Sequence, residues 1–129
     1  MFLPRLLLVV TALLSAQSSR WKDIGKTSTG NTVQIDPKSV KTKDGIITAS
    51  FRVPYVTPID MANGKVTVTR AIAMFNCGKR TVAVKESTMY FDEKAGKVAM
   101  HSKPGLPGFG PTFSSTFSGV AMDYLCPQK

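Results

Sequence analysis

Residues 65–102 contain three strand-like runs separated by two turn signals, a pattern that favours an antiparallel β-meander. Turns are expected at residues 77–79 and 92–96, where glycine and charged side chains interrupt runs rich in Val, Thr, Ile, Phe and Tyr. The apolar alternation slips at residues 85–87, which predicts a β-bulge there. The predicted strands of this region are residues 65–76, 81–91 and 97–102.

Residues 47–55 form the cleanest strand pattern of the chain, because apolar and polar side chains alternate strictly. Such alternation is typical of an antiparallel strand with one face on the core and the other in water. The Asp-Gly pair at residues 44–45 predicts a tight hairpin turn before this strand. Pro54 and Pro58 are predicted to end it and to open a loop.

Two shorter strands are expected nearer the N-terminus. Residues 18–30 predict a short edge strand and a turn, and Trp21 is interpreted as a core anchor rather than an exposed binding residue. Val33 and Ile35 lie on one face of the next predicted strand, which a turn at residues 36–39 should end.

The C-terminal part predicts one helix after a long connection. Residues 103–111 are too rich in proline and glycine to pair in a sheet, and form either a crossover or a binding loop tipped by Leu106 and Phe109. Residues 114–125 have apolar side chains at helical spacing, although Gly119 weakens the helix. The fold class is therefore α+β, an antiparallel sheet of roughly five to six strands with one C-terminal helix packed on it.

Residues 1–16 have the features of a secretory signal peptide, with a basic start, a short apolar run and small residues at its end. The apolar run is too short to span a bilayer, so no transmembrane segment is expected. Residues 17–129 then form a single domain, exported to the periplasm or the cell surface. Gln17 stands where a lipoprotein would have its anchoring cysteine, so no lipid anchor is expected.

The mature protein is expected to be strongly basic. The whole chain carries a net charge of +9, and loss of Arg5 with the signal peptide leaves +8. In an exported protein this charge favours acidic glycans or glycoproteins as partners. Nucleic acid is not expected, because no recognition helix, RNA-binding aromatic pattern or zinc finger accompanies the charge. Exposed sheet edges leave open a monomer or an edge-paired homodimer.

The chain has two cysteines, Cys77 and Cys126, and an oxidising compartment favours one disulfide between them. This bond would tie the last helix to a hairpin tip and contribute about 4 kcal/mol on the chain-entropy model. A zinc site or a redox pair would need more ligands or closer spacing. Lys79 and Arg80, next to the predicted disulfide, form a candidate binding patch for an acidic partner; a solvated, solubilising surface is the alternative.

No catalytic, cofactor-binding or metal residues are assigned. His101 is the single histidine, and no Gly-x-Ser-x-Gly sequence, histidine pair or nucleophilic cysteine accompanies it. It is interpreted as an ordinary edge-strand residue. The acids are scattered and offer no glycosidase-like pair, so we expect a protein that is not an enzyme and holds no cofactor.

A series of short motifs runs along the mature chain in a characteristic order. The motifs are Trp21, Ile24-Gly25, Val33-Gln34-Ile35-Asp36-Pro37, Ser39-Val40, Asn76-Cys77, Tyr90, Asp92, Gly96, Pro111 and Cys126. This series resembles the bacterial surface-adhesin protein E family. The resemblance implies a small exported protein of Gram-negative bacteria, with an antiparallel sheet, a C-terminal helix and a disulfide. It also implies binding of host extracellular-matrix and serum glycoproteins, as named members of that family do.

Two functions remain as hypotheses. The first is an exported, non-enzymatic, adhesin-like protein that contacts host glycoproteins or other acidic surfaces. The second is a soluble periplasmic module with a housekeeping role in the cell envelope.

Overall fold

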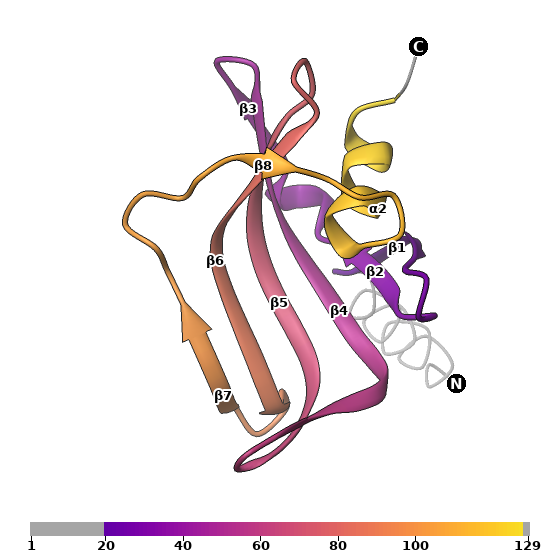
Figure 1. Ribbon diagram of the computed structural model, residues 1–129, viewed down its shortest axis with the longest axis vertical. Helices are drawn as coiled ribbons and strands as arrows, with labels where there is room; N and C mark the ends of the chain where they lie inside the picture. Colours follow the sequence, from indigo (N-terminus) through magenta and orange to yellow (C-terminus); the bar gives the residue numbers. More distant parts are fainter. Residues whose placement is uncertain (1–19, 128–129) are drawn as a thin grey trace, which may run out of the picture.

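The computed structural model describes residues 20–127, and the predicted signal peptide at residues 1–16 lies outside them. Strands precede a single C-terminal α-helix in the described part (Figure 1). The elements are β1 (Lys22–Lys26), β2 (Thr32–Ile35), the 3-10 helix η1 (Pro37–Ser39), β3 (Lys41–Lys43), β4 (Ile46–Met61), β5 (Gly64–Asn76), β6 (Thr81–Asp92), β7 (Lys97–Ser102), β8 (Gly110–Pro111) and α2 (Phe117–Leu125).

All strands join one eight-stranded sheet, whose main path has the order β1-β2-β4-β5-β6-β7. Every pairing is antiparallel, with the short strands β3 and β8 added beside β4 and β6. The long strands β4, β5 and β6 form the curved centre, and α2 lies beside β1 and β2 (Figure 1). The predicted α+β fold is confirmed, and the six strands of the main path match the expected number.

The hydrophobic core lies between α2 and one face of the sheet, here called the helix face. Phe51 of β4 is at its centre and makes edge-to-face contacts with Phe75 at 5.6 Å and with Phe117 at 5.3 Å between ring centroids. The buried core residues are Val33, Ile35, Ala49, Phe51, Val53, Ala73, Phe75, Ala121, Met122 and Cys126.

Pro54 and Pro58 do not end their strand, so that prediction is wrong. β4 continues past both prolines, with a shift in its pairing to β5 after Pro54. Within the described chain, β2 pairs with β4 only as far as Arg52, so the outer edge of β4 is open beyond it. The Val56 N–H faces that edge and donates to Asn31 Oδ1 at 2.9 Å. The nitrogen of Pro54, two residues earlier, faces the same edge, where no N–H is needed.

Trp21 is not a core anchor, in contrast to the prediction. It is half-buried on the face of the sheet opposite α2, and its ring lies 4.7 Å from the Arg20 guanidinium and 5.5 Å from that of Arg70. Alternation explains this position, because Asp23, two residues later, is also on the opposite face and accepts a hydrogen bond from Gln34.

The predicted bulge at residues 85–87 is confirmed. The partner of Ile72 in β6 is Glu86 and the partner of Ala73 is Val84, which leaves Lys85 as the extra residue. The bulge changes the face to which the apolar residues of β6 point, and this explains the slip in the sequence pattern.

The connection from β7 to α2 crosses from the sheet edge to the last helix, and Leu106 and Phe109 are exposed on it. The expectation that none of residues 103–111 pairs is wrong at the end of the segment. Gly110 and Pro111 pair with the first residues of β6. This pairing is possible because β7 covers only the later part of β6, and an edge position tolerates a proline.

Candidate binding surface

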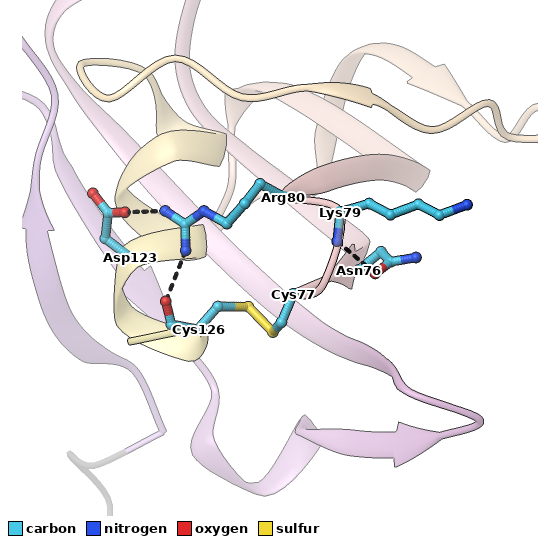
Figure 2. The surroundings of a disulfide bond; sticks show 6 residues. All are labelled: Asn76, Cys77, Lys79, Arg80, Asp123 and Cys126. Carbon is cyan, nitrogen blue, oxygen red and sulfur yellow. Dashed lines mark hydrogen bonds and ion pairs between the residues drawn. A yellow bond between two sulfur atoms is a disulfide. The ribbon is translucent and has the colours of Figure 1, made fainter. Parts of the chain in front are cut away.

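The predicted disulfide is present and joins the β5–β6 turn to the end of α2 (Figure 2). Cys77 follows β5 directly, and Cys126 is the C-terminal cap of α2. Their Cα atoms are 5.4 Å apart, although 49 positions separate them in the sequence. The bond therefore fixes both the hairpin tip and the last helix.

Arg80 is committed to internal contacts. Its guanidinium donates to the carbonyl oxygen of Cys126 at 2.8 Å and to the carboxylate of Asp123 at 2.7 Å (Figure 2). The carbonyl belongs to the C-terminal cap of α2, where a cation is favourable because the helix dipole is negative there. Arg80 thus reinforces the link that the disulfide makes, and an acid already neutralises its charge.

Lys79 has a different environment from its neighbour. Its backbone N–H donates to Asn76 Oδ1 at 3.1 Å, which stabilises the turn, and its side chain is exposed. Figure 2 shows the side chains of Lys79 and Arg80 leaving the turn in opposite directions. The two residues of the predicted patch are adjacent in sequence, but only the ammonium group of Lys79 is left for a partner.

Two lysines of the neighbouring hairpin lie near Lys79. Lys43 pairs with Ile46 across the β3–β4 turn, and Ile46 in turn pairs with Asn76, so this turn and the β5–β6 turn are side by side (Figure 1). Lys41 and Lys43 of β3 are both exposed. We call Lys41, Lys43 and Lys79 the basic end of the molecule.

Lysines and arginines differ in how they are used. Among residues 20–127, every arginine pairs with a carboxylate, whereas Lys65 is the single lysine that does so. The excess positive charge is therefore carried by lysine side chains on exposed turns and strand ends. The arginine pairs are Arg20 with Asp36, Arg52 and Arg70 with Glu93, and Arg80 with Asp123.

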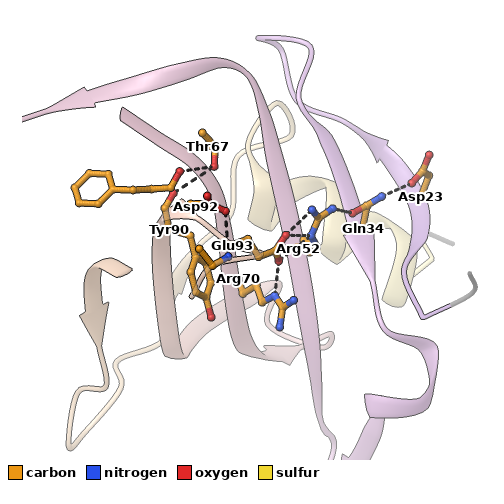
Figure 3. A network of polar contacts seen from close by, with 10 residues as sticks. Asp23, Gln34, Arg52, Thr67, Arg70, Tyr90, Asp92 and Glu93 are labelled. Carbon is orange, nitrogen blue, oxygen red and sulfur yellow. Dashed lines mark hydrogen bonds and ion pairs between the residues drawn. The ribbon is translucent and has the colours of Figure 1, made fainter. Parts of the chain in front are cut away.

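A polar network on the opposite face of the sheet uses two of these arginines (Figure 3). The carboxylate of Glu93, in the turn after β6, accepts hydrogen bonds at 2.6–3.1 Å from Arg52 of β4 and at 2.6 Å from Arg70 of β5. Arg52 also donates to Gln34 of β2 at 2.7 Å, and Gln34 donates to Asp23 of β1 at 2.9 Å. The network spans the sheet from β1 to the end of β6.

The two arginines stabilise the ionised form of Glu93. The hydrogen bond from Arg52 lowers the pKa of the Glu93 carboxyl, and Arg70 acts in the same direction, while partial burial acts against them. The same hydrogen bond raises the pKa of Arg52. The sequence interpretation missed this network, because its members come from four strands and a turn, and no local pattern connects them.

His101 lies on the edge strand β7, as predicted, but it has a partner. Its Nε2 atom is 2.7 Å from Oε2 of Glu86, and this contact lowers the pKa of Glu86. In the described part of the chain no three histidine, cysteine or acidic side chains gather as metal ligands. No helix within residues 20–127 is long and apolar enough to cross a membrane.

These features define a class: a small α+β domain whose curved antiparallel sheet is fastened to one C-terminal helix by a disulfide. The surface-adhesin protein E family model matches residues 21–127, and the chain belongs to that family. No curated protein matches the chain. Adhesins are in general binding proteins rather than enzymes.

Solved structures of Haemophilus influenzae protein E share the fold. Crystal form II has a TM-score of 0.57 at 12% identity, over 84% of this chain and 87% of that one. The selenomethionine form has a TM-score of 0.55 at 13% identity, over 84% and 86%. Protein E from a non-typeable strain has a TM-score of 0.54 at 13% identity, over 84% and 76%. At these identities the likeness concerns the fold alone.

Proposed function

We propose that the protein is an exported, non-enzymatic adhesin that contacts acidic surfaces, such as host extracellular-matrix or serum glycoproteins, through its basic end. Membership of the surface-adhesin protein E family supports the adhesin role. The observation that carries the ligand class is the position of Lys41, Lys43 and Lys79, which are exposed on β3 and on the adjacent β5–β6 turn. None of the three has a carboxylate partner among the described residues.

The structure of these turns favours binding by charge. The disulfide and the Arg80 hydrogen bonds hold the β5–β6 turn, and pairing with β4 holds β3. A rigid backbone lowers the entropy that binding must remove, so the lysine side chains are the main groups that become ordered. Their attraction for an acidic partner extends over a Debye length of about 8 Å at physiological salt.

Binding to heparin tests the ligand class. Heparin serves as the acidic probe, and its affinity for the protein should fall steeply as NaCl rises from about 0.05 to 0.3 M, because the contact depends on screened charges. An affinity that does not change over this range would contradict the proposal.

Localisation tests the adhesin role separately from the ligand. Protease added to intact cells should digest the protein if it is displayed at the surface. Recovery of an undigested protein only in an osmotic-shock fraction would favour the periplasmic, housekeeping alternative.

A further inference from the structure

A cavity on the helix face of the sheet differs in chemistry from the basic end. It is open to solvent on one side and is lined by the β1–β2 turn, the middle of β4 and β5, and the residues that begin α2. Its volume is about 340 Å³, which is within the range of roughly 300–1,000 Å³ typical of small-molecule sites. The proposed function does not use it.

The floor of the cavity is apolar. Phe51, Val53 and Ala71 line it from the sheet and are buried, and Phe117 lines it from α2. The rings of Phe51 and Phe117 pack edge to face, which fixes the shape of this floor.

The rim of the cavity is polar but uncharged, because none of its lining residues is acidic or basic. The hydroxyl groups of Tyr55 and Thr69 lie 2.7 Å apart. A hydroxyl can donate one hydrogen bond and accept two, so this pair keeps one O–H group and several lone pairs for a ligand. In the β1–β2 turn, Asn31 donates to Thr29 Oγ1 at 3.1 Å and accepts from the Val56 N–H, which orients its amide.

This lining discriminates between classes of ligand. A charged ligand would lose its hydration without meeting an opposite charge, which is costly. A purely apolar ligand would cover the hydroxyl and amide groups without satisfying their hydrogen bonds, which is also unfavourable. A neutral sugar ring has an apolar face of C–H groups and an edge of hydroxyl groups, and therefore matches both the floor and the rim.

We propose that this cavity is a binding site for a neutral saccharide, distinct from the charge-dependent contact at the basic end. A second cavity, of about 490 Å³, shares Thr29, Asn31 and Tyr55 with the first and continues past Thr57 to Ile59. The combined groove follows β4 and has room for more than one sugar ring. The ligand is thus an uncharged oligosaccharide rather than a single monosaccharide.

Titration with defined sugars, followed by two-dimensional NMR, tests this site. The probes are four neutral oligosaccharides: maltotriose, mannotriose, chitotriose and N-acetyllactosamine. At least one should shift the backbone amides of Thr27, Thr69 and Phe117. Its dissociation constant should change less than about twofold between about 0.05 and 0.5 M NaCl, because no charges take part.

A matched pair of variants tests the location. Thr69→Val removes the hydroxyl but keeps the side-chain shape, and should weaken sugar binding about tenfold by leaving a polar group unsatisfied. Thr88→Val makes the same change on the opposite face, where Thr88 pairs with Arg70, and should bind like the original protein. Thermal unfolding of both variants establishes that each is folded.

Three results would overturn the saccharide site. One is the absence of amide shifts at the cavity with all four probes, and another is equal binding by the two variants. The third is preferential binding of 1-octanol or of a sialylated sugar there. Since heparin binding depends on salt and on other residues, it can persist when sugar binding fails, and the two proposals are tested separately.

Discussion

Arg52 and Glu93 are 41 positions apart in the chain, yet the guanidinium of one holds both carboxylate oxygens of the other. The contact bridges β4 and the turn after β6, with β5 between them. Arg70 of β5 binds the same carboxylate, so Glu93 ties three neighbouring segments of the sheet together on the face opposite α2. Part of the stability of the sheet therefore depends on one ionised acid.

Replacement of Glu93 by Gln should lower the free energy of unfolding by about 2 kcal/mol near pH 7, because two arginines lose their charged acceptor. Urea denaturation measures this value. Asp60→Asn is the control, since Asp60 pairs with Lys65 at an exposed turn and should contribute less than about 1 kcal/mol. Equal effects of the two substitutions would contradict the role of the network.

The pKa of Glu93 also predicts how stability depends on pH. The folded-state pKa lies below the ordinary value of 4.5, so the folded state binds protons more weakly than the unfolded chain. The contribution of Glu93 is complete above about pH 4.5 and is lost as pH falls through the lower, folded-state pKa. As pH is lowered from about 7 to about 3, the free energy of unfolding should fall less in Glu93→Gln than in the original protein. Identical pH dependence in the two proteins would argue against this linkage.

Replacement by alanine should have different effects at Lys79 and at Arg80. Arg80→Ala leaves the Cys126 carbonyl and the Asp123 carboxylate without their donor, and should lower the free energy of unfolding by about 1–2 kcal/mol. Lys79→Ala should change stability by less than about 0.5 kcal/mol and weaken heparin binding instead. Thermal unfolding and heparin affinity, measured on both variants, test this division. It fails if Lys79→Ala is the less stable protein.

Gly119 should not tolerate alanine, although alanine is the better helix former by about 1 kcal/mol. A Cβ atom at Gly119 would lie 1.9 Å from the backbone oxygen of Phe113, so the loop before α2 would have to move. We expect Gly119→Ala to lower the free energy of unfolding by about 2 kcal/mol. Ser118→Ala, at the half-buried neighbouring position, is the control. A stabilised Gly119→Ala protein would show that the loop adapts.

Reduction of the disulfide should lower the free energy of unfolding by about 4 kcal/mol, because the unfolded chain loses its closed loop. Urea denaturation with and without dithiothreitol measures the difference. In the reduced protein, the helical signal in circular dichroism should be lost at lower urea concentration than the strand signal, since Cys126 ends the single described helix. Coincident midpoints in both conditions would contradict this contribution.

Local sequence patterns were enough to predict most of the fold. Strict alternation identified β4, the Asp-Gly pair identified its hairpin, and two cysteines in a chain expected to be exported identified the disulfide. These features depend on neighbouring residues or on composition. Trp21 was misplaced because a large aromatic ring is equally able to fill a core or to lie between two arginines on a sheet surface.

The sites depended on contacts that the sequence does not contain. The sequence identifies Asp92 and Glu93 only as turn residues. The contacts of Glu93 with Arg52 and Arg70 form only after β4, β5 and β6 have paired. The patch of Lys79 and Arg80 rested on their adjacency, whereas the direction of each side chain depends on the left-handed backbone at Arg80 and on the position of α2. The cavity of the proposed saccharide site has lining residues from four separate segments of the chain and no sequence signature.

The most direct measurement of the proposed adhesin function compares two variants of equal charge for binding to immobilised heparin. One replaces Lys41, Lys43 and Lys79 by alanine at the basic end, and the other replaces Lys65, Lys94 and Lys97 at the turns of the opposite end. All six lysines are exposed, and both variants lose the same net charge. We expect the first variant to bind about tenfold more weakly than the second at physiological salt. Equal affinities would show that total charge alone attracts the probe, and would contradict a binding surface at the basic end.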